Sequence, residues 1–370
     1  MEQFLLVLLI FFLTVVTIQV VYYLFVFGKF SFAKSEKVAP KHLSVSVIVC
    51  AKNEEENIKN YLPLLLNQNY PSYEVVVIDD ASSDDTRFLI EEFQKTHHNL
   101  KLVKVENNEA FWGNKKFALT LGIKAASNEY LLFTDADCYP ATNEWIAEMT
   151  SHFTMHKTFV LGYGAYEKMS GFLNKLIRFE TLLTATQYFG WAKVGKPYMG
   201  VGRNLAYKKE EFFRVNGFIN HMKIRSGDDD LFVNEAAHKN NTTISFNPEG
   251  FTYSRPKETF GEWFMQKRRH ASTAVYYKSF DKFQLSLFYF TQLFFYLLPI
   301  PLLALQFEWI VVLSAIAFRY LVSWISLGFS AGKLDEKDVI YWYPVLEIIL
   351  IFTQINVFFR NLFSKPVTWK

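Results

Sequence analysis

Hydrophobic positions fall into long uncharged runs near the two ends of the chain and into short runs between them. Residues 3–28 carry no charge. Three further apolar segments cover residues 283–307, 309–332 and 339–359. Each run is long enough to cross a hydrocarbon core of about 30 Å as a helix. We therefore expect four membrane spans. Arg319 and Glu347 interrupt the last two and should face protein, where they can pair, because a charge facing lipid is costly.

Two alternatives to this arrangement stay open. For the first run the alternative is a cleaved signal peptide, although the start Met1-Glu2-Gln3 lacks the basic residues typical of one. For one of the last three segments the alternative is a re-entrant or interfacial helix. Basic residues after the first run and within 255–282 favour the cytosol for both flanks of the middle region. The basic tail 361–370 also favours the cytosol, whereas four spans would place it outside, so three or five spans remain alternatives.

The middle of the chain, residues 44–254, alternates short β-branched runs with helical segments. The runs expected to be strands are 44–50, 74–78, 100–105 and 130–134, and the expected helices are 54–66, 84–95 and 114–126. This alternation predicts βαβ units and a parallel sheet, whose ligands bind beyond the carboxyl ends of the strands. The predicted organisation is an anchor at 1–28, an α/β domain at 44–254, a basic amphipathic interface segment at 255–282, transmembrane helices at 283–360 and a short tail at 361–370.

Composition narrows the class of protein further. The 370 residues include 39 Lys and Arg against 36 Asp and Glu, and this balance does not favour a nucleic-acid partner. Hydrophobic residues make up 51% of the chain, which excludes a disordered protein. Cys50 and Cys138 lie in apolar runs, with no spacing typical of a disulfide framework or a zinc site.

Carboxylates follow two of the predicted strands directly. Asp79 and Asp80 end the second strand, where they can accept hydrogen bonds from a base or a ribose, whereas the nearby acids at 84–85 suit a helix start. Asp135 and Asp137 follow the fourth strand, and a spacing of two on an extended chain puts both side chains on one side. Oxygen ligands of this kind suit Mg²⁺ or Mn²⁺ bound to a diphosphate. The alternative is that the two aspartates only form a turn after the strand.

Two later clusters add candidate chemistry. Residues 228–230 are three adjacent aspartates, which repel one another and need a cation, basic neighbours or a raised pKa. A carboxylate with a raised pKa can serve as a general base, and the alternative is a solvated helix start. Residues 266–270 lie in the basic segment before the second apolar run. An Arg there suits phosphate oxygens, and the alternative is a membrane-surface helix.

The order of these clusters resembles the membrane-bound family 2 glycosyltransferases, which have the GT-A fold. The resemblance covers about residues 44–275 and the membrane layout. It implies that Ala51 and Glu54 lie near the base of a bound nucleotide, and that residues 79–84 form the DDxSxD element in which Asp80 or Asp79 contacts uracil or ribose. Lys115 matches the lysine of a GKxxAL stretch near the phosphates.

The same resemblance implies roles for the later clusters. Asp135 and Asp137 match the metal-binding DxD, and Asp229 matches the catalytic base of the ED or GDD motif, with Asp228 beside it on the acceptor side. Asn204, in the stretch 200–207, resembles the GxNxAY loop of the acceptor side. The last match is to the QxxRW motif, which implies donor-binding roles for Gln266 and Arg269 and an acceptor-side position for His270. His270 stands where the family's polysaccharide synthases carry Trp.

The resemblance implies an inverting transfer of a sugar from a nucleotide-diphosphate donor, such as a UDP-sugar, to a glycan or lipid acceptor in cell-envelope or polysaccharide biosynthesis. It implies Mg²⁺ or Mn²⁺ as cofactor and an integral protein of the plasma or inner membrane with a cytosolic catalytic domain. Two alternatives are transfer onto polyprenyl phosphate, which needs little help from a base, and a non-catalytic membrane subunit of a polysaccharide assembly complex.

Overall fold

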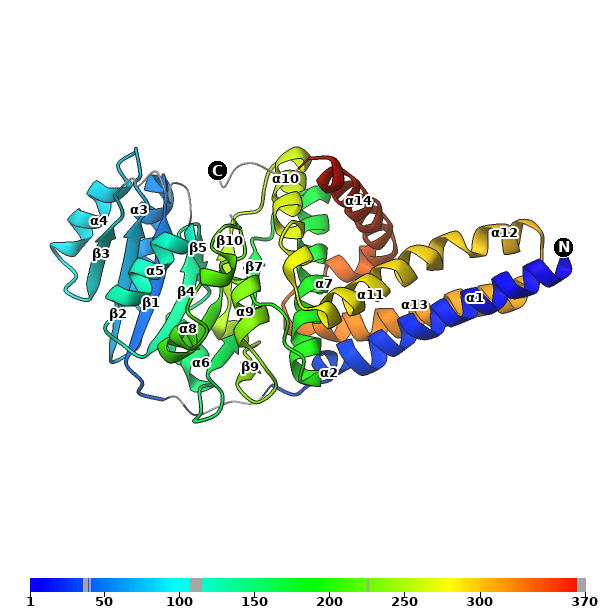
Figure 1. The fold of residues 1–370 in the computed structure, drawn as a ribbon, viewed down its shortest axis with the longest axis horizontal. Helices are drawn as coiled ribbons and strands as arrows, with labels where there is room; N and C mark the ends of the chain where they lie inside the picture. Colours follow the sequence, from blue (N-terminus) through cyan, green and yellow to red (C-terminus); the bar gives the residue numbers. More distant parts are fainter. Residues whose placement is uncertain (36–38, 40, 107–114, 225, 365–370) are drawn as a thin grey trace.

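The computed structural model describes residues 1–35, 39, 41–106, 115–224 and 226–364, and the statements below concern these residues. They form an α/β domain and a bundle of long helices that extends from one side of it (Figure 1). Residues 365–370, most of the predicted tail, lie outside the described residues, as does Asn114 at the start of one predicted helix.

The main sheet has the strand order β3-β2-β1-β4-β8-β6-β9 among the described residues. Its first four strands are parallel, and they are β1 (Val45–Ala51), β2 (Tyr73–Asp79), β3 (Leu100–Lys104) and β4 (Tyr130–Asp135). The antiparallel β8 (Leu205–Lys208) joins this half to β6 (Phe159–Leu161) and β9 (Thr242–Ile244). The four predicted strands are confirmed to within one residue at each end. The central strands β1, β2 and β4 are largely apolar runs between polar loops, whereas the edge strand β3 also contains the exposed Lys101 and Lys104.

Helices cover both faces of this sheet. One face packs against α3 (Glu55–Leu66), α4 (Thr86–Gln94) and α6 (Trp145–Ser151). The other packs against α5 (Lys115–Ala125), α7 (Phe172–Val194) and α9 (Asp230–Ala236), with the short α8 (Lys209–Arg214) beside β8. The mixed α/β sheet with helices on both faces confirms the predicted fold class.

A small second sheet and several single turns complete the domain. The sheet has the order β5-β10-β7, from β5 (Cys138–Pro140), β10 (Thr252–Ser254) and β7 (Gly164–Tyr166). Helix α10 (Phe260–Ala271) follows β10 and begins with a capping box, in which Thr259 and Glu262 bond each other's backbone N–H groups. The 3₁₀ turns are η2 (Ile219–His221), η3 (Pro248–Gly250), η4 (Ala274–Tyr276) and η5 (Val339–Trp342).

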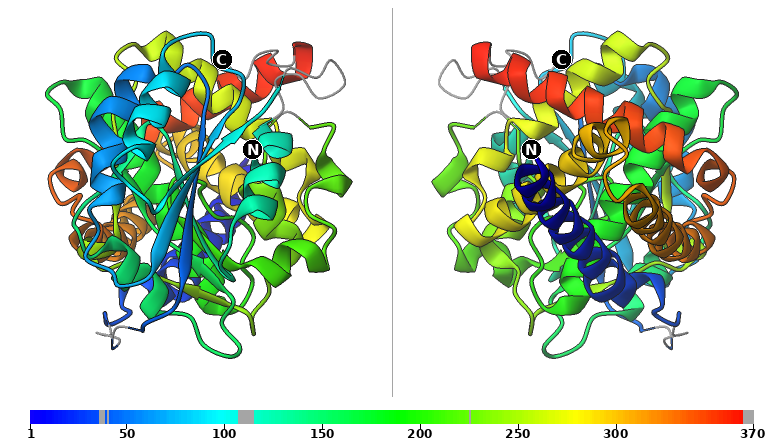
Figure 2. Two further views of the ribbon diagram at one scale, coloured as in Figure 1. Left: turned by 90° about the vertical axis from the view of Figure 1, so that its left-hand side faces the viewer. Right: turned by 90° about the vertical axis from the view of Figure 1, so that its right-hand side faces the viewer.

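The helical bundle contains the four apolar segments predicted from the sequence. The first is α1 (Glu2–Val21), continued by a π-helical stretch η1 (Tyr22–Phe27) and by α2 (Gly28–Ser31). The others are α11 (Ser279–Leu297) with α12 (Pro299–Ala304), α13 (Trp309–Lys333), and η5 with α14 (Tyr343–Phe363). Among the described residues these four segments are long and apolar enough to cross a membrane. In Figures 1 and 2, α1, α11 and α13 extend away from the domain, whereas α14 lies across their direction.

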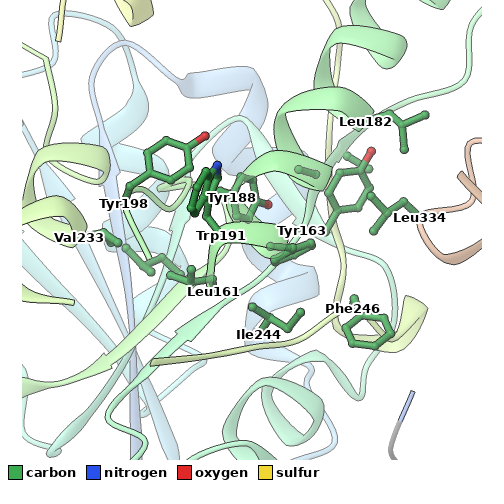
Figure 3. Close-up of a cluster of buried hydrophobic side chains, with 14 of the residues drawn as sticks. Leu161, Tyr163, Leu182, Tyr188, Trp191, Tyr198, Val233, Ile244, Phe246 and Leu334 are labelled. Atoms are coloured by element: carbon green, nitrogen blue, oxygen red, sulfur yellow. The ribbon is translucent and has the colours of Figure 1, made fainter. Parts of the chain in front are cut away.

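Helix α7 joins the bundle to the domain. A Cβ on Gly190 would lie 2.8 Å from the carbonyl oxygen of Val26, so only glycine lets α7 approach the π-helical stretch this closely. The ring of Trp191 packs edge-on against Tyr22. Figure 3 shows the buried cluster under this junction, where side chains of the sheet, α7 and Leu334 meet. The domain and the bundle therefore share one continuous core.

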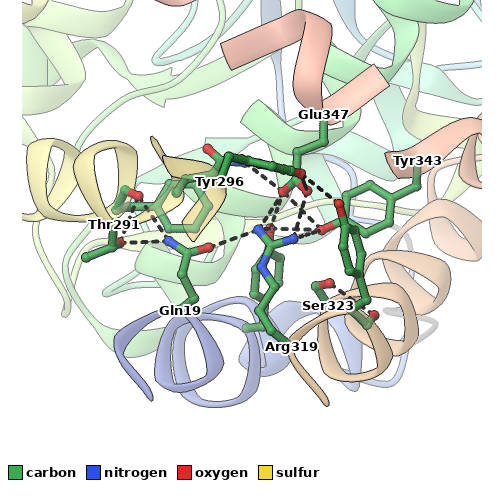
Figure 4. Close-up of polar contacts among 11 residues, drawn as sticks. Gln19, Thr291, Tyr296, Arg319, Ser323, Tyr343 and Glu347 are labelled. Carbon is green, nitrogen blue, oxygen red and sulfur yellow. Dashed lines mark hydrogen bonds and ion pairs between the residues drawn. The ribbon is translucent and has the colours of Figure 1, made fainter. Parts of the chain in front are cut away.

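The two charges inside the apolar segments pair with each other, as expected. Nη2 of Arg319 lies 2.6 Å from Oε1 of Glu347, and both side chains are buried. Gln19 of α1 accepts a hydrogen bond from Arg319, and Gln292 of α11 donates one to Glu347 (Figure 4). A buried ion pair is stabilised only when its remaining hydrogen-bonding groups are also satisfied, and residues of four helices contribute to that here.

Candidate active site

The predicted site lies where β1, β2 and β4 end. In the sheet register Ala51 is opposite Asp79, and Cys50 is opposite Asp135, so carboxylates stand on both sides of the end of β1. The carbonyl oxygen of Ala51 accepts a hydrogen bond from the N–H of Asp80 at 2.8 Å. This edge of a parallel sheet is where ligands of α/β domains bind.

Asp79 and Asp80 are both buried and have different local partners. Oδ1 of Asp79 accepts a hydrogen bond from the N–H of Ser82, which shapes the turn after β2. Oδ2 of Asp80 lies 3.5 Å from the ammonium group of Lys52. The two carboxylates therefore lie at the rim of the sheet. One carboxylate oxygen of Asp79 already accepts a backbone hydrogen bond.

The loops after β1 and β2 hold each other in place. The N–H of Asn53 donates to Oγ of Ser82, and the N–H of Ser83 donates to Oδ1 of Asn53. Asn53 and Ala81 both have φ of 53°, a conformation that costs energy for residues other than glycine. The N–H of Glu54 donates to Thr86, so Glu54 is also held at this rim. The backbone strain marks the turn as a preformed structure.

Asp135 and Asp137 offer carboxylate oxygens close enough together to share one divalent cation. A carboxylate oxygen of each, together with Sγ of Cys138, lies within 4.8 Å of the others. The thiol of Cys138 donates to Asp137, so the oxygen atoms are the available hard ligands, and hard oxygen ligands suit Mg²⁺ and Mn²⁺. Partial desolvation by the surrounding protein, and then the carboxylates of Asp135 and Glu54, raise the pKa of Asp137. A bound cation would favour the ionised form.

Lys115 connects the DxD pair to the aspartate cluster. Its ammonium nitrogen lies 2.6 Å from Oδ1 of Asp135 and 3.0 Å from Oδ2 of Asp228. Burial lowers the pKa of Lys115, but the two carboxylates outweigh this and raise it well above its usual value. Burial likewise opposes ionisation of Asp228, and Lys115 reverses that effect and lowers the pKa of Asp228. Lys115 is thus a fixed positive charge between two acidic elements.

The three adjacent aspartates have three different environments. Asp228 pairs with Lys115, whereas Asp230 is buried and accepts hydrogen bonds from the hydroxyl groups of Thr273 and Tyr277. Asp229 caps α9, and its oxygens accept hydrogen bonds from the backbone N–H groups of Asp230 and Gly202. Burial and the charges of Asp228 and Asp230 raise the pKa of Asp229 to about 7. Of the three, Asp229 has the pKa best suited to accept a proton near neutral pH.

The loop from Gly202 to Asn204 lies between Asp229 and the small sheet. A Cβ on Gly202 would lie 3.3 Å from Oδ2 of Asp229, so the absence of a side chain allows the close N–H contact. The Asn204 side chain points into the protein, where it bonds Trp145 and two backbone carbonyl groups and is fully buried. Asn204 was expected on the acceptor side, and the structure instead uses its side chain to brace the loop.

Helix α10 carries the Gln266, Arg269 and His270 of the predicted motif. Gln266 donates to the hydroxyl group of Tyr166, while its Oε1 is buried without a hydrogen-bond partner among the described residues. Arg269 is half-buried and His270 is exposed. Gln266 therefore contacts the small sheet through Tyr166, and none of the three residues lines the cavity formed by Lys115, Asp135, Asp228 and Asp229.

Sequence reasoning missed two residues that link these elements. The guanidinium group of Arg203 stacks on the ring of Tyr166 at 4.3 Å and donates to Ser254 of the small sheet. Tyr166 in turn contacts Gln266, so Arg203 connects α10 with the neighbourhood of Asp137. The basic residue within the stretch 200–207 was the available signal, but nothing in the sequence indicates the ring on which it stacks.

Comparisons with known proteins identify the domain. Residues 46–224 match the model of the glycosyl transferase family 2. The poly-beta-1,6-N-acetyl-D-glucosamine synthase of Staphylococcus epidermidis is 36% identical over 121 residues, covering 32% of this chain and 28% of the relative. The probable glycosyltransferase YdaM of Bacillus subtilis is 27% identical over 243 residues, covering 61% of this chain and 54% of the relative. These two matches therefore cover no more than 54% of the length of either relative.

A solved structure has the same fold. The mannosyltransferase PcManGT from Pyrobaculum calidifontis, in complex with GDP-Man and Mn²⁺, superposes with a TM-score of 0.56 at 19% identity, covering 92% of this chain and 99% of the other. The domain therefore has the GT-A fold. Residues 46–224 therefore form a glycosyltransferase family 2 domain.

Proposed function

We propose that the protein transfers a sugar from a nucleotide-diphosphate donor, first of all a UDP-sugar, to a hydroxyl group of a membrane-associated glycan or lipid, with inversion at the anomeric carbon. The observation that carries this proposal is Asp229, whose pKa of about 7 suits a general base and which lines one cavity with Asp135 and Lys115. The name of the Staphylococcus epidermidis relative makes an N-acetylglucosamine donor the first to test.

On the donor side, the carboxylates of Asp79 and Asp80 and the backbone at Ala51 and Glu54 bind the nucleoside. Asp137 and Asp135 would hold Mg²⁺ or Mn²⁺, which would supply positive charge to stabilise the diphosphate leaving group. Lys115 holds Oδ1 of Asp135 and so orients this carboxylate. Arg269 and Gln266, on α10, contribute to the phosphate and sugar end of the donor, and the unpaired Oε1 of Gln266 is suited to accept a hydrogen bond there.

On the acceptor side, Asp229 takes the proton of the acceptor hydroxyl group as its oxygen attacks the anomeric carbon. The bond from that carbon to the diphosphate oxygen breaks, and the nucleoside diphosphate leaves with the electron pair. A single displacement needs one base and inverts the configuration. Asp228 stays ionised beside Lys115 and keeps its charge next to Asp229, while His270 lies at the acceptor entrance on α10.

For the location, we propose an integral membrane protein of the plasma or inner membrane with the α/β domain in the cytosol. The apolar helices support membrane insertion, and the basic residues beside them support the orientation. The proposed regions are the anchor 1–28, the catalytic domain 44–254, the interface segment 255–282 and the helices within 283–360. This location brings a lipid-linked acceptor to the same surface as α10.

The test is the release of nucleoside diphosphate by purified protein in detergent, with a panel of nucleotide sugars and with Mn²⁺ or EDTA. We expect metal-dependent UDP release from one donor, and loss of transfer in Asp229→Asn with donor binding retained. Asp335→Asn, an exposed acid outside the cavity, is the matched control. An active Asp229→Asn variant would show that the acceptor is a phosphate that needs no base. Donor binding without any release would support a non-catalytic assembly subunit.

A further inference from the structure

Helix α14 belongs to the segment 338–364, and both ends of this segment are hydrogen-bonded to helices next to the α/β domain. At its start, Asp338 accepts a hydrogen bond from Nη1 of Arg178 in α7 at 2.8 Å. Near its end, Asn361 exchanges two hydrogen bonds with Arg268 of α10, each 2.9 Å long, and Oγ of Ser364 accepts a third. Helix α7 is part of the domain and α10 follows its last strand β10 directly, so residues 338 and 361–364 lie on the same side of the bundle.

Between these ends the segment reaches into the bundle and returns. Glu347, near the start of α14, pairs with Arg319 in the middle of α13. From there α14 runs back towards α10 instead of away from the domain (Figure 1). In the right-hand view of Figure 2 the red helix runs across the picture, whereas the orange α13 is seen nearly end-on. A membrane-crossing helix would have to run parallel to α13 and end at its far end.

From these contacts we propose that residues 339–363 form a re-entrant segment that enters the membrane from the domain side and returns to that side, so the described chain crosses the membrane three times. The crossing helices are α1, α11 with α12, and α13. The inference rests on the membrane insertion proposed above. It eases the conflict noted in the sequence, because the basic Arg360 at the end of α14 then lies on the domain side, where basic residues are favoured.

The surface of α14 fits lipid as its partner. One face packs on the protein through Leu346, Leu350 and Val357, which are buried. The opposite face exposes a mostly apolar stripe made of Val345, Ile348, Phe352 and Phe359, which the exposed Asn356 interrupts. A stripe of this kind on a helix that continues the surface of three spanning helices is suited to acyl chains.

The two ends of the segment carry the residues that favour a membrane surface. Tyr341 and Trp342 are exposed before α14, as aromatic residues often are at the level of lipid headgroups. Arg360, at the other end, is exposed and lies over the ring of Phe264 in α10. Helix α14, embedded in lipid, thereby holds α10 with Gln266, Arg269 and His270 at the membrane surface.

Side-specific cysteine labelling tests the topology of the full chain. The reagent is a membrane-impermeant maleimide, and the sample is sealed vesicles with the domain facing out. The variants are Lys337→Cys before α14, Ser364→Cys after it and Gln306→Cys between α12 and α13. The native Cys50 and Cys138 are buried, so the unmodified protein is the blank. We expect residues 337 and 364 to be labelled without detergent, and residue 306 only with it.

Each outcome of this labelling has a distinct meaning. Labelling of residue 364 only with detergent, as for residue 306, would show that α14 crosses the membrane and would overturn the inference. Labelling of residue 306 without detergent would overturn the proposed membrane insertion itself.

Depth measurements provide a second, independent test. Spin labels at Phe352→Cys and Phe359→Cys occupy the same face of α14, and in a crossing helix their depths would differ by about 10 Å. We expect residue 359, which is nearer the end of α14, to lie closer to the domain-side membrane surface than residue 352. The opposite order, with residue 359 nearer the far surface, would contradict the inference.

Discussion

The ammonium nitrogen of Lys115 lies 2.6 Å from Oδ1 of Asp135, and this contact joins the start of α5 to the end of β4. The same nitrogen lies 3.0 Å from Asp228, next to the candidate base. One cation therefore balances an acid on the proposed donor side and an acid on the proposed acceptor side.

Replacing this cation should affect both activity and stability. We expect Lys115→Met to lower kcat/KM by about 100-fold or more, because a preorganised charge at a reacting centre is lost. Leaving two carboxylates without a partner should also lower the free energy of unfolding by about 3 kcal/mol. Thermal unfolding and UDP-release assays measure the two effects. Lys124→Met, an exposed position on the same helix, is the control and should change neither.

The raised pKa of Asp229 predicts how kcat/KM falls at low pH. With a pKa raised to about 7 in the free protein, the base is protonated below that pH, so kcat/KM should fall tenfold per pH unit there. In Asp229→Asn this pH dependence should disappear together with the activity. A wild-type profile that is flat from pH 5 to 8 would contradict the assignment.

The same raised pKa has a consequence for stability. Between the usual pKa of an aspartate and about 7, the folded protein binds a proton that the unfolded chain releases, so Asp229 makes folding less favourable as the pH rises through this range. We expect Asp229→Asn to raise the melting temperature at pH 8 and to leave it nearly unchanged at pH 3.5. A loss of stability at pH 8 would indicate that the carboxylate mainly serves as the cap of α9.

Metal removal should have an effect that does not depend on turnover. We expect Mn²⁺ with UDP to raise the melting temperature. At a ligand concentration one hundred times the dissociation constant, binding adds about 2.7 kcal/mol to the free energy of unfolding. EDTA should reverse the shift, and Asp137→Ala should abolish it. Asp85→Ala, an exposed acid before α4, should retain the full shift.

The pair of Arg319 and Glu347 should show strong coupling. Arg319→Leu and Glu347→Leu should each destabilise the protein in detergent by about 3–5 kcal/mol, because each leaves a buried charge without its partner. The double variant should lose less than the sum of the two. Additive losses in thermal unfolding would mean that the two residues act through their other contacts.

Local patterns were sufficient for much of the fold. The parallel strands β1, β2 and β4 were predictable because each is a largely apolar run that is buried on both faces, and the acids after β2 and β4 interrupt these runs abruptly. The edge strand β3 is only partly buried and was predictable from its place in the alternation of strands and helices. The pairing of Arg319 with Glu347 was also predictable, since a charge in an apolar helix has few stable partners. The DxD pair and Asp229 were predicted from their sequence positions and from the family resemblance, and their roles stay predictions.

Other properties depend on contacts between distant parts of the chain. The different environments of Asp228, Asp229 and Asp230 come from Lys115, Gly202 and Tyr277, and no spacing rule connects these residues. The inward orientation of Asn204 depends on Trp145, and the stacking of Arg203 depends on Tyr166. The path of α14 is the clearest case. Its composition is that of a spanning helix, but Arg178, Arg319 and Arg268 hold three points along the segment. Hydropathy measures the preference of a helix for lipid and carries no information about its direction, which is set by these contacts.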